Sequence, residues 1–209
     1  MVEQTAILAA PGRGSRRERY KERTRLDLAV AAFELARSEG LAAVRVPQIA
    51  AAVGVSPRTF NNYFASKEQA IAWLAGRHAA GMAAALQGRP ADEPLGSALV
   101  EAVVGELRPG RDDGLPAHWL RDFRALVANE PALHGAYLAA AASAERNLGD
   151  AIAARDPSLG LLPARVLAAM VTGAERAAVQ HWMQGRSGTL EATVRRALEQ
   201  AVAGIGQRP

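Results

Sequence analysis

Side chains that can read nucleic-acid bases are concentrated between positions 56 and 67 of this 209-residue chain. Arg58 carries the paired donors that fit a guanine edge, and Asn62 carries the donor and acceptor that fit adenine. Groups that bind phosphate oxygens lie in the same segment, at Thr59, Asn61, Tyr63 and Lys67. These residue types predict contact with double-stranded DNA. The full set of candidate contacts is Arg45, Ser56, Pro57, Arg58, Thr59, Asn61, Asn62, Tyr63 and Lys67.

The elements that must position these side chains are two short helices joined by a three-residue turn. The pattern predicts one helix over 46–53 and a second over 57–64. Gly54 can adopt the positive φ that a sharp turn requires. Ser56 can cap the second helix, and Pro57 fits its first turn. These features together predict a helix-turn-helix whose second helix enters the major groove. The alternative is a plain helical hairpin with a polar outer face.

Positive charge is gathered in one short segment near the N-terminus. Residues 13–25 hold seven basic and two acidic side chains, whereas the net charge of the whole chain is only +4. A basic arm on an otherwise balanced body favours a polyanionic partner, most simply nucleic acid. The alternative is a solvated, disordered tail. We expect residues 1–18 to form a flexible basic tail.

The whole chain has the composition of an all-α protein. Alanine, leucine and arginine dominate, aromatic residues make up 5%, and alternating β-branched runs are absent. We expect a three-helix DNA-binding domain over 19–66 and a helical effector-binding and dimerisation domain over 67–209. Glycine and proline breaks predict about nine helices, at 20–38, 46–53, 57–64, 66–87, 95–107, 116–129, 131–155, 163–184 and 189–204.

The segment from Leu28 to about Leu74 resembles the N-terminal domain of the TetR family of transcriptional regulators. The resemblance rests on Gly54-Val55-Ser56 and above all on Tyr63-Phe64-Ala65-Ser66-Lys67-Glu68. It implies a homodimer, a palindromic operator and a ligand-binding domain downstream, and thus a ligand-responsive regulator, most simply a repressor. Two positions depart from the family pattern. Arg45 replaces the usual capping threonine, for which Gln48 can compensate by reaching back to the backbone, and Asn61 replaces a common aromatic residue.

The C-terminal two thirds are less specific. Family likeness implies that 163–204 pairs with its twin in a second copy, and apolar residues recur at spacing four at Leu190, Val194, Leu198 and Val202. Ordinary core within one chain gives the same periodicity. The stretch 120–137 and His181-Trp182 resemble the effector domain of regulators linked to mycofactocin and acyl-CoA sensing, which suggests a largely apolar or acylated effector. Candidate pocket residues are Trp73, His78, Met82, Trp119, Phe123, Tyr137, Met170, Arg176 and His181.

The sequence offers little support for enzyme chemistry. There is no cysteine, no histidine pair has metal-ligand spacing on a helix, and neither a phosphate loop nor a nucleophile elbow is present. We therefore expect no catalytic site, no metal and no cofactor. No apolar run approaches about 18 residues, so we expect no membrane span and a cytoplasmic protein. Two other functions stay open: a helical small-molecule-binding or scaffold protein without specific DNA binding, and an architectural DNA binder without an effector.

Overall fold

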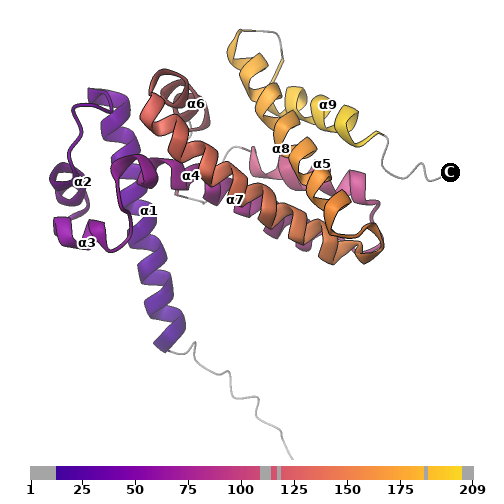
Figure 1. The fold of residues 1–209 in the computed structure, drawn as a ribbon, viewed down its shortest axis with the longest axis horizontal. Helices are drawn as coiled ribbons and strands as arrows, with labels where there is room; N and C mark the ends of the chain where they lie inside the picture. The colour runs from indigo at the N-terminus through magenta and orange to yellow at the C-terminus, as the bar shows by residue number, and fades with distance from the viewer. Residues whose placement is uncertain (1–12, 109–113, 117–118, 186–187, 204–209) are drawn as a thin grey trace, which may run out of the picture. The chain divides into compact units, whose positions relative to one another are not determined.

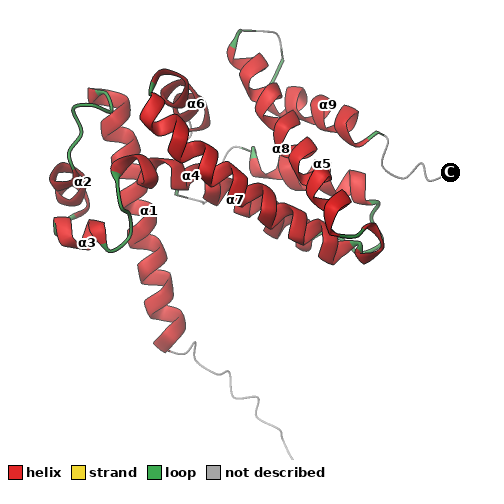
Figure 2. Ribbon diagram, viewed as in Figure 1, coloured by secondary structure: helices red, strands yellow, loops and turns green. Residues whose placement is uncertain are grey.

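The computed structural model describes residues 13–108, 114–116, 119–185 and 188–203, which Figure 1 shows as coloured ribbon. Within these ranges the chain forms nine α-helices and no strand (Figure 2), which confirms the predicted all-α class. The chain divides into two compact units, Met1–Lys67 and Glu68–Pro209. Among the described helices, none combines the length and the apolar character that a membrane span needs.

The first unit contains three helices around a small apolar core. They are α1 (Arg13–Glu39), α2 (Val46–Val53) and α3 (Pro57–Asn61). Each helix contributes fully buried side chains, with Leu28 and Phe33 from α1, Ile49 from α2 and Phe60 from α3. Because one apolar stripe per helix faces this core, the polar side chains of the same helices are left facing solvent.

Helix α1 begins earlier than the sequence indicated. We expected a flexible tail up to residue 18 and a helix from Tyr20, but residues 13–18 are helical. Arginine, glutamate and lysine all have high helix propensity, so a charged segment can extend a helix that is already nucleated by its packed C-terminal half. The rest of the predicted tail, 1–12, lies outside the described residues.

The second unit contains the remaining six α-helices, whose predicted positions agree with the structure to within three residues. After a short 3₁₀ helix (Pro157–Leu159), the chain turns back for the last two. The six helices are α4 (Lys67–Gln87), α5 (Leu95–Glu106), α6 (Trp119–Asn129), α7 (Pro131–Arg155), α8 (Leu161–Met183) and α9 (Leu190–Val202).

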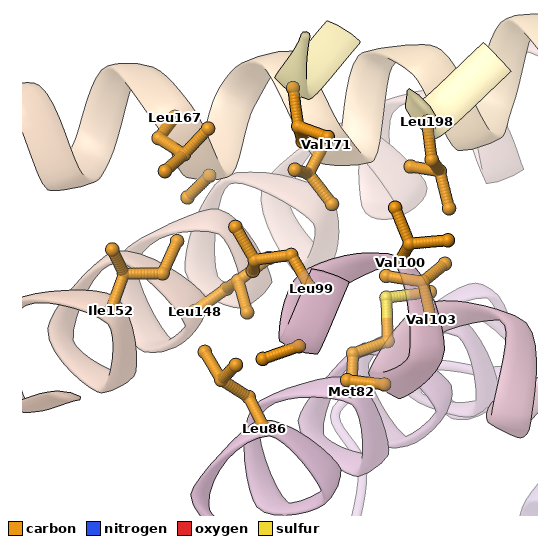
Figure 3. Close-up of a cluster of buried hydrophobic side chains, with 14 of the residues drawn as sticks. Met82, Leu86, Leu99, Val100, Val103, Leu148, Ile152, Leu167, Val171 and Leu198 are labelled. Atoms are coloured by element: carbon orange, nitrogen blue, oxygen red, sulfur yellow. The ribbon is translucent and has the colours of Figure 1, made fainter. Parts of the chain in front are cut away.

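Helix α5 lies at the centre of the second unit. Figure 3 shows its Leu99, Val100 and Val103 surrounded by apolar side chains from α4, α7, α8 and α9. Arg155 at the end of α7 fixes the connection that leads into α5. Its guanidinium donates to the carbonyls of Leu86, Arg89, Pro90 and Glu93.

The regular apolar spacing in α9 belongs to this core. Val194, Leu198 and Val202 are at most 9% exposed and pack within their own chain, as does Val171 of α8. These four side chains are therefore core residues and not contacts with a second copy. A contact with a second copy and a core within one chain both require one apolar face on each helix, so the periodicity alone did not distinguish them.

Candidate functional site: a nucleic-acid interface and a buried cavity

The turn between α2 and α3 has the geometry that its residues predict. Gly54 ends α2 with φ of 73°, the left-handed conformation that glycine adopts without strain. The amide of Val55 donates to the carbonyl of Ala50 over 2.9 Å. Ser56 caps α3, because its Oγ accepts the Thr59 amide at 3.1 Å. This turn sets the direction in which α3 leaves the unit.

Helix α3 is shorter than predicted, but it exposes the side chains proposed to read DNA. The helix ends at Asn61, and the amides of Tyr63 and Phe64 still bond to the carbonyl of Phe60, so one more turn follows. Phe60 is fully buried, whereas Arg58, Asn61 and Asn62 are exposed. The buried ring anchors α3, and the polar groups are left on its outer face.

The structure confirms the predicted compensation at Arg45. The backbone amide of Arg45 donates to Oε1 of Gln48 over 2.7 Å, which satisfies one of the free donors at the start of α2. The exposed Arg45 guanidinium turns back on the preceding loop and donates to the carbonyls of Ala42 and Val44. The role of Arg45 in binding DNA stays a prediction.

The side chain of Lys67 is hydrogen-bonded to a loop that is distant in the sequence. Its Nζ donates to the carbonyl oxygens of Leu41 and Val44, at 2.6 Å and 2.9 Å. The ammonium thus joins the start of α4 to the loop between α1 and α2. One of its three donors is left for a phosphate. Tyr63 is half-buried, as is Thr59, whose hydroxyl lies 2.9 Å from that of Ser56.

A cavity in the second unit brings together six of the nine predicted pocket residues. It lies among α4, α6, α7 and α8 and has a volume of about 40 Å³. The six predicted residues in its wall are His78, Met82, Trp119, Phe123, Tyr137 and Arg176.

The other three predicted pocket residues lie elsewhere. Trp73 is out of helical register with the α4 residues that line the cavity. Met170 is 46% exposed on the outer face of α8. His181 lines a separate groove of about 340 Å³ between α8 and α9. Residue type suggested these positions, but the face of each helix decides which side chains reach the cavity.

The sequence analysis missed three of the four charged wall residues, Arg124, Glu145 and Glu175, and found only Arg176. Glu175 of α8 is only 4% exposed, and its carboxylate lies 3.8 Å from both His78 Nε2 and Arg124 Nη2. Burial alone would raise the pKa of Glu175, but His78, Arg124 and Arg176 outweigh it and hold that pKa below its usual value. The available signal was a glutamate at a position of α8 where the helical repeat places apolar residues. Because a buried charge is almost always paired, such a glutamate predicts a charged partner nearby.

Two family models match the chain and together cover most of it. Residues 28–71 match the model of bacterial regulatory proteins of the tetR family. Residues 93–206, more than half of the chain, match the model of the MftR C-terminal domain, which is a TetR-type C-terminal domain. The chain belongs to the TetR family. Members of this family are transcriptional regulators and not enzymes.

Individual relatives agree with this assignment. The chain is 38% identical over 143 residues to the HTH-type transcriptional regulator TcmR of Streptomyces glaucescens. The match covers 67% of this chain and 63% of TcmR, so it spans less than two thirds of the relative.

A solved structure shows the same fold at low identity. A putative TetR-family transcriptional regulator from Mesorhizobium loti has a TM-score of 0.52 and 15% identity, with 88% of this chain and 96% of that one covered. A transcriptional regulator from Rhodococcus sp. Rha1 has a TM-score of 0.49 and 18% identity, with coverages of 88% and 99%.

In this TetR-family chain, no cluster of three or more His, Asp or Glu within the described residues is placed to hold a metal ion.

Proposed function

We propose that this protein is a homodimeric, ligand-responsive repressor that binds a palindromic operator through α3 and is released by a small effector bound in its second unit. Two copies of α3 would enter successive major grooves about one helical turn apart. Homodimers and repressors are typical of the family. The alternative is a helical binding or scaffold protein that no longer recognises specific DNA.

The observation that carries the proposal is the exposed polar face of α3. Arg58, Asn61 and Asn62 face solvent beside a fully buried Phe60 and a correctly capped N-terminus. Arginine and asparagine are the side chains that pair most directly with guanine and adenine edges. We infer that Arg58 and Asn62 read bases. We infer that the other candidate residues contact the sugar-phosphate backbone of the DNA; they are Arg45, Ser56, Pro57, Thr59, Asn61, Tyr63 and Lys67.

The first turns of α1 extend the proposed DNA interface. Figure 1 shows α1 projecting well beyond α2 and α3 within the first unit. Every residue from Arg16 to Arg23 is exposed, so these turns bury nothing within the described chain. Arg16, Arg19 and Arg23 share one helical face. We infer that this basic face binds phosphates next to the site that α3 reads.

Helix α4 provides the link between effector and DNA. It begins at Lys67, which bonds to the loop of the first unit, and it contributes His78 and Met82 to the cavity of the second. A ligand that favours one position of α4 therefore biases both units. Couplings of this kind are typically ~1–3 kcal/mol, or about 5- to 150-fold in DNA affinity.

We expect the Arg58→Ala variant to bind its operator about 5- to 150-fold more weakly, because a bidentate contact to a base contributes ~1–3 kcal/mol. Specificity at the contacted base pair should relax. The measurement is fluorescence anisotropy with an operator obtained by selection from random DNA.

The matched control is Arg37→Ala. Arg37 is an arginine of the same unit at the far end of α1, where it pairs with Glu34. It should leave operator affinity unchanged. Equal affinity of Arg58→Ala and the wild type would overturn the base-reading role of α3.

We expect the double variant Arg16→Ala/Arg19→Ala to weaken binding to operator and to scrambled DNA by the same factor, because phosphate contacts carry no sequence information. The slope of log affinity against log salt should fall by about 0.9 for each phosphate that the variant no longer neutralises. Titrations at four salt concentrations measure it. The control is Arg121→Ala/Arg146→Ala, two exposed arginines of the second unit. An unchanged slope in the first variant would remove α1 from the interface.

A further inference from the structure

The cavity of the second unit is small and partly polar. Its volume of about 40 Å³ accommodates one small polar group, since a single water needs about 10–15 Å³. An apolar cavity that holds a benzene ring is nearer 150 Å³. The space as it stands therefore fits the polar end of a ligand, and the ring of Trp119 or Phe123 must rotate to admit the rest.

Three buried polar atoms in the wall of this cavity make no hydrogen bond within the described chain. They are Nε2 of His78, Nε of Arg124 and Oε1 of Glu175. The side chains are 8%, 16% and 6% exposed, and all three residues line the cavity. A buried polar atom without a partner costs free energy, so these atoms favour any molecule that can satisfy them.

The spacing of the unpaired atoms fits a bridging oxygen. His78 Nε2 and Glu175 Oε1 are 3.8 Å apart, which is too far for a direct hydrogen bond. An oxygen about 2.8 Å from each atom fits between them. Such an oxygen must donate a hydrogen bond to the carboxylate and can accept one from an imidazole or guanidinium N–H.

The charges around the cavity disfavour a charged ligand. Its wall holds two carboxylates, Glu145 and Glu175, and two guanidinium groups, Arg124 and Arg176. A ligand anion would meet the carboxylate of Glu175, and a ligand cation would meet Arg124. A neutral group that both donates and accepts avoids both conflicts, and a hydroxyl is the smallest group that does so.

We propose that the effector is a neutral molecule whose hydroxyl bridges Glu175 and His78 at the base of this cavity and whose apolar body lies against Trp119, Phe123 and Met82. The three aromatic side chains of this wall pack at steep angles to one another, with centroids 5.9 Å apart for Trp119–Phe123 and 5.8 Å for Phe123–Tyr137. Such a wall fits a flat apolar ring. This inference rests on the proposed role of the second unit as the effector domain.

The test compares four probes that share one ring and differ in one group: phenol, toluene, benzoate and benzylammonium. Binding to the full chain without DNA is measured by isothermal titration calorimetry. We expect phenol to bind at least tenfold more tightly than each of the other three. If toluene binds as tightly, the hydroxyl is not recognised; if benzoate or benzylammonium binds best, the cavity selects a charge. Absence of phenol binding would also overturn the inference.

The variant Glu175→Gln separates recognition from folding. It keeps the shape of the side chain but removes the unpartnered carboxylate oxygen that accepts from the ligand hydroxyl and repels an anion at that point, so the preference for phenol over benzoate should fall at least tenfold or reverse. The matched control is Glu145→Gln, because the Glu145 carboxylate already accepts from Thr172 Oγ1 at 3.2 Å. It should keep the preference. Equal ratios in both variants would contradict the role of Glu175.

A separate measurement keeps this inference distinct from the proposed function. Operator affinity is measured with and without saturating phenol. Release of DNA supports both proposals together. Selective phenol binding with unchanged operator affinity would support the recognition of a hydroxyl and contradict the effector role of the cavity.

Discussion

The Phe60→Ala variant should lose specific DNA binding and unfold its first unit. Phe60 is fully buried and packs against Phe64, with ring centroids 5.8 Å apart. Removing a buried phenylalanine side chain costs ~3–5 kcal/mol. A unit of 67 residues has a stability near the lower end of the ~5–15 kcal/mol range, so this loss removes most of it.

Two optical probes can separate the effects on the two units. All three tryptophans, Trp73, Trp119 and Trp182, lie in the second unit, so their fluorescence reports unfolding there. Circular dichroism reports the helices of both units. In a guanidinium titration of Phe60→Ala, we expect an early transition by circular dichroism and an unchanged transition by fluorescence. Operator affinity should fall to the level of scrambled DNA.

Two controls define the result. Phe60→Leu retains most of the apolar volume and should cost much less than Phe60→Ala. Tyr20→Ala removes an aromatic ring that is 70% exposed and should leave the unfolding transition unchanged. If Phe60→Ala melts like the wild type and binds its operator within twofold, the buried ring does not hold α3 in place.

The agreement between sequence and structure is best where local chemistry decides the outcome. Gly54, Ser56 and Gln48 each make the contact that their type predicts, because turns and caps depend on a few neighbouring residues. Helix ends followed the glycine and proline breaks for the same reason.

The prediction of the cavity failed where long-range packing decides. Glu175 and Arg124 lie 51 residues apart on two different helices, so no local pattern places them 3.8 Å from one another. The pair of Glu175 and Arg124 thus became visible only with the packing of α6 against α8. Met170 and His181 have side chains that suit a pocket, but both lie on faces of α8 that do not line the cavity, and the sequence does not show which face that is.

The exposed face of α8 gives the second prediction of large effect. Leu162, Val166 and Met170 recur at spacing four and are 73%, 50% and 46% exposed. Together with Leu161, they make up four of the six large hydrophobic side chains exposed in the described chain. An exposed apolar stripe of this kind marks an interface with another protein chain. We take it as the centre of the proposed homodimer contact, which then begins slightly before the predicted segment 163–204.

The Met170→Glu variant should be a monomer. In a two-fold symmetric contact each substitution occurs in both copies, so two carboxylates would be buried close together without a partner. Sedimentation velocity should show one copy in place of two at micromolar concentration. Because a monomer reaches only one half-site, operator affinity should fall at least 100-fold, while the affinity for scrambled DNA should change much less.

The matched control is Leu138→Glu, which adds the same charge at a leucine that is 50% exposed on α7 and lies outside the stripe. It should remain dimeric and bind its operator as the wild type does. If both variants stay dimeric, the contact between copies lies on another face of the second unit. If Leu138→Glu alone becomes a monomer, α7 replaces α8 as the interface. In either case the apolar stripe of α8 would need a different partner.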